Sequence, residues 1–305
     1  MFDILSEDSR GFAISMDLLL ALIPLTLVLG FVVADMDNIL YQMEDTVFRG
    51  ATDRAASDAV TALITTSGDP YDWETNTTVS QNNIVAGLAQ YDTLKGAPVE
   101  GTIDPIKLAS LNETHIQSLI GSNYQYFLNV TTINKTAPAT LKIMGNANYP
   151  NAKDVVKVER VVLSSKLKVV SSLISQIKYS GASQIYTIPS FQTNTASINS
   201  YDYWILIANN QRFTAASVSV NNNMINFTST NINSPQKIDS AFLNNNASTP
   251  NKYFNNIVTL NATGSFLSSM DFYIVQTPKG TVASEINKDT VLPQKSKFDL
   301  YLWVN

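Results

Sequence analysis

Residues Phe12 to Ala34 read FAISMDLLLALIPLTLVLGFVVA, and this stretch decides how the chain is organised. Asp17 is its only charged residue, and no charge occurs from Leu18 to Ala34. The run is close to the ~20 apolar residues that a bilayer-spanning helix needs, and longer than the roughly 7–15 residues of most signal-peptide cores. A buried core helix is the alternative, but so uniform an apolar run is unusual for one. The stretch therefore predicts a membrane-directed helix.

The helical pattern continues past the apolar stretch as far as Thr66. Apolar residues recur at steps of three and four, which places them on one stripe of an α-helix. They are Met36, Ile39, Leu40, Met43, Val47, Ala51, Ala55, Ala59, Ala62 and Leu63. Pro24 should kink or loosen the apolar half, which membrane helices tolerate. Arg10, the only basic residue of the leader, favours an N-terminus inside the cell and the rest of the chain outside.

The composition excludes several classes of function. The chain has 305 residues, a net charge of −5 and no cysteine. The negative charge gives a nucleic-acid partner no electrostatic support. Without cysteine there are no disulfides, thiolate metal sites or cysteine nucleophiles.

The remainder of the chain is predicted to be a β-rich head. A short helix is expected at Ile84 to Tyr91, and Asp104-Pro105 should open a second helix with one apolar face. That face comprises Leu108, Leu111, His115, Leu119 and Ile120. The single histidine has no partner ligands in the sequence, so we interpret His115 as a packing residue.

Strand patterns of period two begin at Tyr124. Strands are expected at 124–133, 139–144, 155–164, 203–208, 217–220, 224–228, 257–260, 271–277 and 298–304. Tyr203 to Ile207 is apolar on both faces, which is typical of a central strand. Lys166 to Lys178 fits helix or strand, Ile238 to Leu243 is expected to form a short helical turn, and Ser180 to Ser200 is polar and irregular.

The predicted fold is therefore α+β. A long N-terminal helix, spanning a membrane in its first half and amphipathic in its second, carries a mostly antiparallel sheet or sandwich. Turn residues at Asn221-Asn222-Asn223 and Pro278-Lys279-Gly280 favour the antiparallel arrangement. The predicted segments are a leader at 1–11, the helix at 12–66, a head subdomain packed on the helix at 67–179 and a β-sandwich-like subdomain at 180–305.

The sequence holds no recognisable catalytic or cofactor motif. There is no G-x-S-x-G elbow, P-loop, G-x-G-x-x-G or H-E-x-x-H. We therefore expect neither enzyme activity nor a cofactor or metal. Carboxylates among the strands are the residual candidates for chemistry: Asp202, Asp239, Asp271 and Asp299. Aromatic candidates for binding sugars are Tyr201, Tyr253, Tyr301 and Trp303, although core packing is the commoner role.

Asn-x-Ser/Thr triplets mark candidate glycosylation sites on an exported head. They begin at Asn76, Asn112, Asn129, Asn134, Asn226, Asn246 and Asn261. An Asn- and Thr-rich chain also produces such triplets by chance.

The first 110 residues resemble archaeal type IV pilin-like proteins. Arg10-Gly11-Phe12 looks like the junction that a prepilin peptidase cuts, Asp17 like the acidic residue near the start of a mature pilin helix, and Pro24 like its helix proline. The stretch from Gly68 to Glu74, Gly87-Leu88-Ala89 and the segment from Lys107 to Leu111 are similar to the region after the helix in that family.

The sequence departs from the family pattern in two respects. The leader is acidic rather than basic. A cut after Gly11 puts the acid at position six rather than the usual five, whereas a cut after Phe12 restores five but lacks the small residue. The resemblance implies processing at Gly11 and Phe12, and it implies assembly with other pilin-like subunits through Asp17 and Pro24. Asp17 at the membrane interface, beside the positive end of the helix, is the plain alternative.

The expected function is a cell-surface, pilin-like subunit, in the membrane with an extracellular head or in a filament after processing. The large head favours a minor or tip component with an adhesive role toward surface glycans. The alternative is a single-pass anchored surface protein that binds a partner or glycan and never polymerises. A secretory signal cut after Val32-Val33-Ala34 is a third interpretation, but the helical pattern runs straight through that site.

Overall fold

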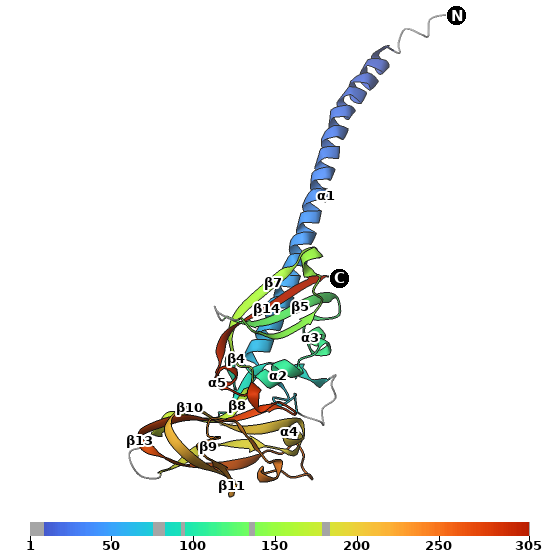
Figure 1. Cartoon of the computed structure of the whole chain (residues 1–305). Helices are drawn as coiled ribbons and strands as arrows, with labels where there is room; N and C mark the ends of the chain where they lie inside the picture. The colour runs from blue at the N-terminus through green and yellow to red at the C-terminus, as the bar shows by residue number, and fades with distance from the viewer. Residues whose placement is uncertain (1–8, 76–82, 93–94, 134–137, 179–183, 305) are drawn as a thin grey trace, which may run out of the picture. The chain divides into compact units, whose positions relative to one another are not determined.

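The structure is a computed structural model that describes residues 9–75, 83–92, 95–133, 138–178 and 184–304 (Figure 1). The chain divides into two compact units, residues 1–54 and residues 55–305. The described part of the first unit is helical, and the second unit contains the strands.

The first unit is formed by most of helix α1, which runs from Ser9 to Thr65 over 57 residues. Pro24 lies within it. From Leu18 to Val33, every large apolar side chain is between 50 and 69 % exposed. The long apolar N-terminal helix that the sequence predicts is therefore confirmed. The side chains of residues 9–15 and of Asp17 lie outside what the structure describes.

The second unit contains the end of α1 and two six-stranded sheets. The first sheet has the order β3 (Ala89–Asp92), β4 (Ala97–Ile103), β7 (Val156–Ser164), β14 (Gln294–Val304), β5 (Tyr124–Thr132) and β6 (Thr140–Gly145). All neighbours are antiparallel except β4 and β7. Alternate side chains of β5 and β14 face a core that also holds Ala56, Ala59, Val60 and Leu63 of α1. Small residues near the end of α1 allow this close packing.

The second sheet is built on two long strands, β10 (Tyr201–Val220) and β13 (Phe254–Pro278). Around them lie β11 (Asn223–Phe227), β12 (Gln236–Ile238), β8 (Lys168–Lys178) and β9 (Gln184–Thr193). The pairing of β10 with β13 is interrupted between Ala208 and Ala215, where Asn209 and Arg212 have positive φ. Side chains from both sides of this interruption share one core, including Ile205, Val218, Leu260 and Ile274.

Shorter elements lie between the strands of the two sheets. They are β1 (Gly68–Asp69) paired with β2 (Val85–Ala86), α2 (Pro105–Ser110), α3 (Glu113–Ile120), α4 (Thr195–Ser200), α5 (Lys288–Val291), η2 (Tyr149–Asn151), η3 (Ser240–Phe242) and η4 (Ala283–Glu285). Asn221 and Asn222 both have positive φ between β10 and β11. This is the type I′ hairpin geometry that Asn tolerates, so the turn expected at Asn221-Asn222-Asn223 is present.

Three local predictions are wrong. Residues 84–91 form β2 and β3 rather than a helix. The helix opened by Asp104-Pro105 ends at Ser110, and a second helix begins because the Asn112 side chain accepts a hydrogen bond from the His115 backbone nitrogen. The segment 180–200, expected to be irregular, contains β9 and α4. For the segment 166–178, where the sequence left helix and strand open, the structure has strand β8.

The two sheets do not divide the chain at residue 180. Strand β8, which precedes this position, belongs to the second sheet, whereas β14 at the C-terminal end belongs to the first. The segment 180–305 therefore contributes strands to both sheets. The coarse prediction of a mostly antiparallel, β-rich head is confirmed.

Candidate functional site

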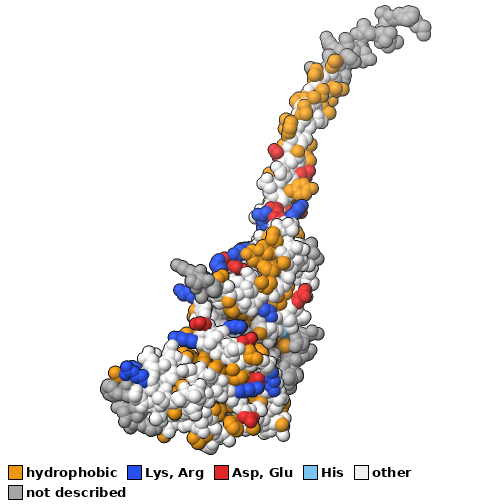
Figure 2. Space-filling model, in the orientation of Figure 1, with side chains coloured by type: hydrophobic (Ala, Val, Ile, Leu, Met, Phe, Trp, Pro, Cys, Tyr) orange, Lys and Arg blue, Asp and Glu red, His pale blue; other side chains and the backbone are white. Residues whose placement is uncertain are grey.

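The apolar half of α1 is the first candidate site. Among the described residues, α1 is the one helix long and apolar enough to cross a membrane. Figure 2 shows hydrophobic side chains gathered along it. Gly11 and Phe12 are helical in the structure, but the exposure of Gly11 and the side chains of Phe12 and Asp17 lie outside the described part. The processing and assembly roles of Gly11, Phe12, Asp17 and Pro24 stay predictions.

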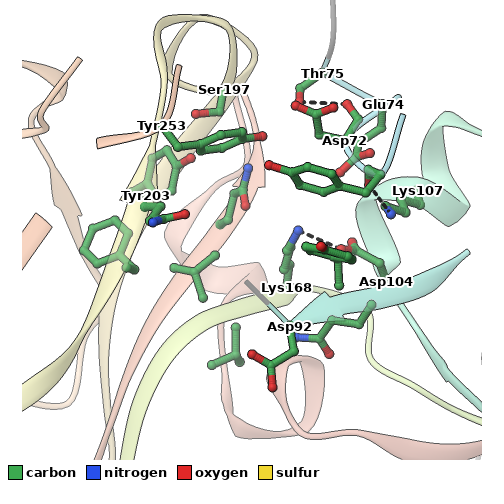
Figure 3. A pocket seen from close by; sticks show the side chains of 18 of the residues that line it. Asp72, Glu74, Thr75, Asp92, Asp104, Lys107, Lys168, Ser197, Tyr203 and Tyr253 are labelled. Atoms are coloured by element: carbon green, nitrogen blue, oxygen red, sulfur yellow. Dashed lines mark hydrogen bonds and ion pairs between the residues drawn. The ribbon is translucent and has the colours of Figure 1, made fainter. Parts of the chain in front are cut away.

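The second candidate is a cavity of about 280 Å³ in the head, seen in Figure 3. The segment that follows α1 and the start of α2 line one part of it, and strands of the second sheet line another. Its polar and aromatic residues are Tyr71, Asp72, Glu74, Thr75, Gln90, Tyr91, Asp92, Asp104, Lys107, Lys168, Ser190, Phe191, Gln192, Ser197, Tyr203, Tyr253, Asn255 and Gln276.

Two lysines compensate the carboxylates that line this cavity. Lys107 is 1 % exposed, and its Nζ donates to the Ser67 carbonyl oxygen at 2.6 Å and to the Tyr71 carbonyl oxygen at 2.5 Å. Lys168 Nζ lies 2.6 Å from Asp104 Oδ2, and Asp104 Oδ1 accepts the Ile106 backbone N–H at 3.0 Å as the N-cap of α2. Asp104 thus joins the start of α2 to strand β8.

Burial sets the protonation of this cluster. Desolvation raises the pKa of Glu74 to about 7, against the opposing effect of Lys168. Desolvation also lowers the pKa of Lys107, because an ammonium loses its hydration there. For Lys168, burial lowers the pKa, but the charges of Asp104 and Glu74 outweigh it and the net shift is upward. Glu74 is consequently the group of this cluster whose charge changes near neutral pH.

Replacing Glu74 with Gln should remove a pH dependence of stability. The pKa of Glu74 in the fold lies above its ordinary value of 4.5, so the folded state binds more protons than the unfolded state between pH 4.5 and 7. Its contribution to stability is full below pH 4.5 and is lost as the pH rises through 7. At pH 8 the Glu74→Gln variant should be more stable than the parent by about 1–3 kcal/mol, and at pH 4 the two should be similar. Urea unfolding of both chains in detergent micelles at each pH measures this. A parent advantage at pH 8 contradicts it.

Aromatic side chains form another part of the cavity wall. The rings of Tyr71 and Tyr91 stack with centroids 4.3 Å apart, and the ring centroids of Phe191 and Tyr203 are 5.8 Å apart. Burial raises the pKa of Tyr203 to about 12. Trp73 does not line the cavity; its Nε1 donates to the Gly87 carbonyl oxygen at 2.9 Å, and its ring packs edge to face on His115 with centroids 4.8 Å apart.

His115 is 2 % exposed and takes part in the capping box of α3, so the structure gives it the packing role expected from the sequence.

The four carboxylates singled out from the sequence each have a separate local partner. Asp202 pairs with Lys237 at 2.8 Å and Asp299 with Lys157 at 3.1 Å. Asp271 accepts hydrogen bonds from the Ser175 backbone nitrogen and the Asn209 side chain. Asp239 caps the short helix η3. The described contacts bring no two of these carboxylates together.

Of the aromatic candidates, Tyr253 lines the cavity, whereas the other three do not. Tyr201 and Trp303 are 9 and 5 % exposed, and Tyr301 stacks on Tyr149 with centroids 4.2 Å apart. Sequence reasoning missed Glu74, Lys107 and Lys168 as site residues. The available signal was Lys107, a charge directly beside the apolar Ile106 and Leu108 in a short helix.

The candidate glycosylation sites differ in accessibility. Asn112, Asn226, Asn246 and Asn261 are exposed, whereas Asn129 is half-buried with a buried Oδ1 atom. Asn76 and Asn134 lie outside the described residues. Use of any of these sites stays a prediction.

Comparison with family models, with curated proteins and with solved structures finds no match to this chain.

Proposed function

We propose that this chain is a cell-surface, pilin-like subunit that is held in the membrane by α1 and assembles with related subunits through the same helix. The observation that supports it most is the character of α1. Its large apolar side chains from Leu18 to Val33 are exposed, while Ala56, Val60 and Leu63 near its other end belong to the core of the head.

The exposed half of α1 needs an apolar environment. Exposed side chains of this size and number do not persist in water on a stable monomer, so lipid or other apolar helices must cover them. In lipid, sideways packing of helices depends on shape and close contact rather than on the hydrophobic effect. A helix that passes from lipid into a bundle of sister helices keeps its apolar surface covered in both states.

The continuity of α1 also favours retention of the helix. A cut after Ala34 would begin the chain inside the helix at Asp35. It would also separate the exposed stripe of Met36, Ile39 and Leu40 from the apolar half of α1. The competing function is a permanently anchored surface protein with the same head. It retains the whole of α1 and its leader and does not assemble.

The N-terminal mass of the native protein tests the proposal. We expect a mature chain that begins at Phe12 or Ala13, recovered in sheared surface filaments, because the leader must be removed before assembly. Mass spectrometry of the N-terminal peptide from membranes and from the filament fraction measures this. An intact Met1 found only in membranes supports the anchored alternative and overturns assembly. A chain that begins at Asp35 overturns both.

A further inference from the structure

We propose that the cavity between Tyr71, Tyr203 and Gln276 binds a single sugar ring of a neutral glycan. This proposal deepens the adhesive role and rests on the proposed surface location of the head, since that location exposes the cavity to glycans. Three features of the cavity carry it: unused hydrogen-bonding groups, a balanced charge and an aromatic wall.

The floor of the cavity is a row of three polar side chains. Gln276 of β13 lies opposite Tyr203 of β10 and opposite Lys168 of β8, so the three side chains share one face of the sheet. Gln276 is only 6 % exposed, and its side-chain amide has no hydrogen-bond partner among the described residues. Among the described residues, the buried Oε2 atom of Glu74 also has no hydrogen-bond partner.

These groups indicate a polar occupant. A buried polar atom without a partner, such as Oε2 of Glu74, costs about 1–3 kcal/mol, and few are tolerated in a folded protein. A side-chain amide offers two donors and an acceptor, and a carboxyl group offers acceptors and, when protonated, one donor. Together they match the hydroxyl groups of a sugar, each of which both donates and accepts. Water can occupy the same positions until the sugar displaces it.

The charge of the cavity favours a neutral ligand over a cation or an anion. Asp104 is paired with Lys168 at 2.6 Å, and Asp92 with Lys95 at 3.7 Å. Lys107 is attracted to both Glu74 and Asp72, and burial raises the pKa of Glu74 to about 7, which leaves this carboxyl largely uncharged at mildly acidic pH. No strong net charge remains for an ionic ligand to neutralise.

The aromatic wall and the size of the cavity define the ligand further. Tyr71 is 37 % exposed and stacks on Tyr91, which leaves aromatic surface at the entrance. Such surface packs against the apolar C–H face of a sugar ring while the polar floor binds its hydroxyls. A volume of about 280 Å³ lies at the lower limit for ligand pockets. One ring fits, and an extended oligosaccharide does not.

The test uses the full chain in micelles of lauryldimethylamine oxide, a detergent without a sugar head group. The probes are the methyl glycosides of glucose, mannose, galactose and N-acetylglucosamine. Saturation-transfer NMR measures the binding of each glycoside to the protein. We expect at least one glycoside to bind with a millimolar Kd, and Gln276→Leu to weaken it about tenfold or more. The matched control is Gln211→Leu on the exposed bend of β10, which should bind like the parent.

Tyr71→Ala provides a second variant in case Gln276→Leu fails to fold, because Tyr71 is partly exposed and its removal leaves the core intact. It should also weaken binding. The inference is overturned if none of the four glycosides binds at a glycoside concentration of about 20 mM, because this concentration detects even weak binding of a single ring. Binding that is equal in the parent and in a folded Gln276→Leu or Tyr71→Ala variant also overturns it. Glycoside binding by the protein in micelles does not depend on leader processing or assembly. The binding experiment and the N-terminal mass measurement can therefore fail separately.

Discussion

A chain carrying both Leu22→Arg and Leu29→Arg should fail to enter the membrane. Both leucines are more than half exposed on the apolar part of α1. The twelve Leu, Ile, Val and Phe residues from Leu18 to Val33 favour insertion by about 4–7 kcal/mol together on insertion scales. Two arginines near the middle of the span oppose it by about 5–7 kcal/mol and also remove two favourable leucines. The sign of the insertion free energy therefore reverses.

Alkaline extraction and flotation of membranes measure this change. The parent chain should stay with the lipid, and the double variant should be extracted. The matched control is Leu40→Arg with Met43→Arg, which places the same two charges on exposed positions of the amphipathic half of α1. This control should remain in the membrane. Equal extraction of both double variants would show that α1 is held by something other than its apolar half.

The sequence was sufficient to predict α1 because the evidence for it is local. An uninterrupted apolar run followed by a stripe of period 3.6 has few other structural solutions. The same is true of the turn at Asn221 and Asn222, where two positive φ angles suit Asn and match the twist of a hairpin.

The sequence pattern located most strand segments but did not show which segments belong to one continuous strand. Two short candidates, 203–208 and 217–220, are parts of one strand, β10, and 257–260 and 271–277 are parts of β13. Between the two parts of β10, the chain is polar and Asn209 and Arg212 adopt positive φ. At this point the chain bends without leaving the sheet, as a bulge allows, and only the neighbouring strand shows that pairing resumes.

The cavity was beyond sequence reasoning because its residues are far apart in the chain. Glu74, Asp104, Lys168 and Gln276 come together only after β8 joins the second sheet and α2 begins at Asp104. The helix wrongly expected at residues 84–91 shows the same limit. A short apolar stretch fits either structure, and the pairing of β1 with β2 and of β3 with β4 decides for the strand.

Lys107→Met should destabilise the head strongly. Methionine keeps the length of the buried stem but removes the ammonium group. The carbonyl oxygens of Ser67 and Tyr71 then lose their donor, and Glu74, Asp104 and Asp72 lose a neighbouring positive charge. Breaking such a buried charged network costs about 3–5 kcal/mol, a large share of the 5–15 kcal/mol that stabilises a typical domain. A head of this size should lose roughly 10 °C in Tm.

Lys142→Met is the matched control, because Lys142 Nζ also donates to a backbone carbonyl, that of Ala109 at 2.9 Å, but from an edge strand. Its loss should cost about 1 kcal/mol or less. Thermal unfolding in micelles, followed by the fluorescence of the buried Trp73, Trp204 and Trp303, compares the two variants. The cost of Lys107→Met should also be smaller at pH 5 than at pH 8, because Glu74, with a pKa raised to about 7 by burial, is then protonated and needs no positive neighbour. A small, pH-independent loss equal to that of Lys142→Met would mean that the Lys107 ammonium does not hold the segment after α1 to α2.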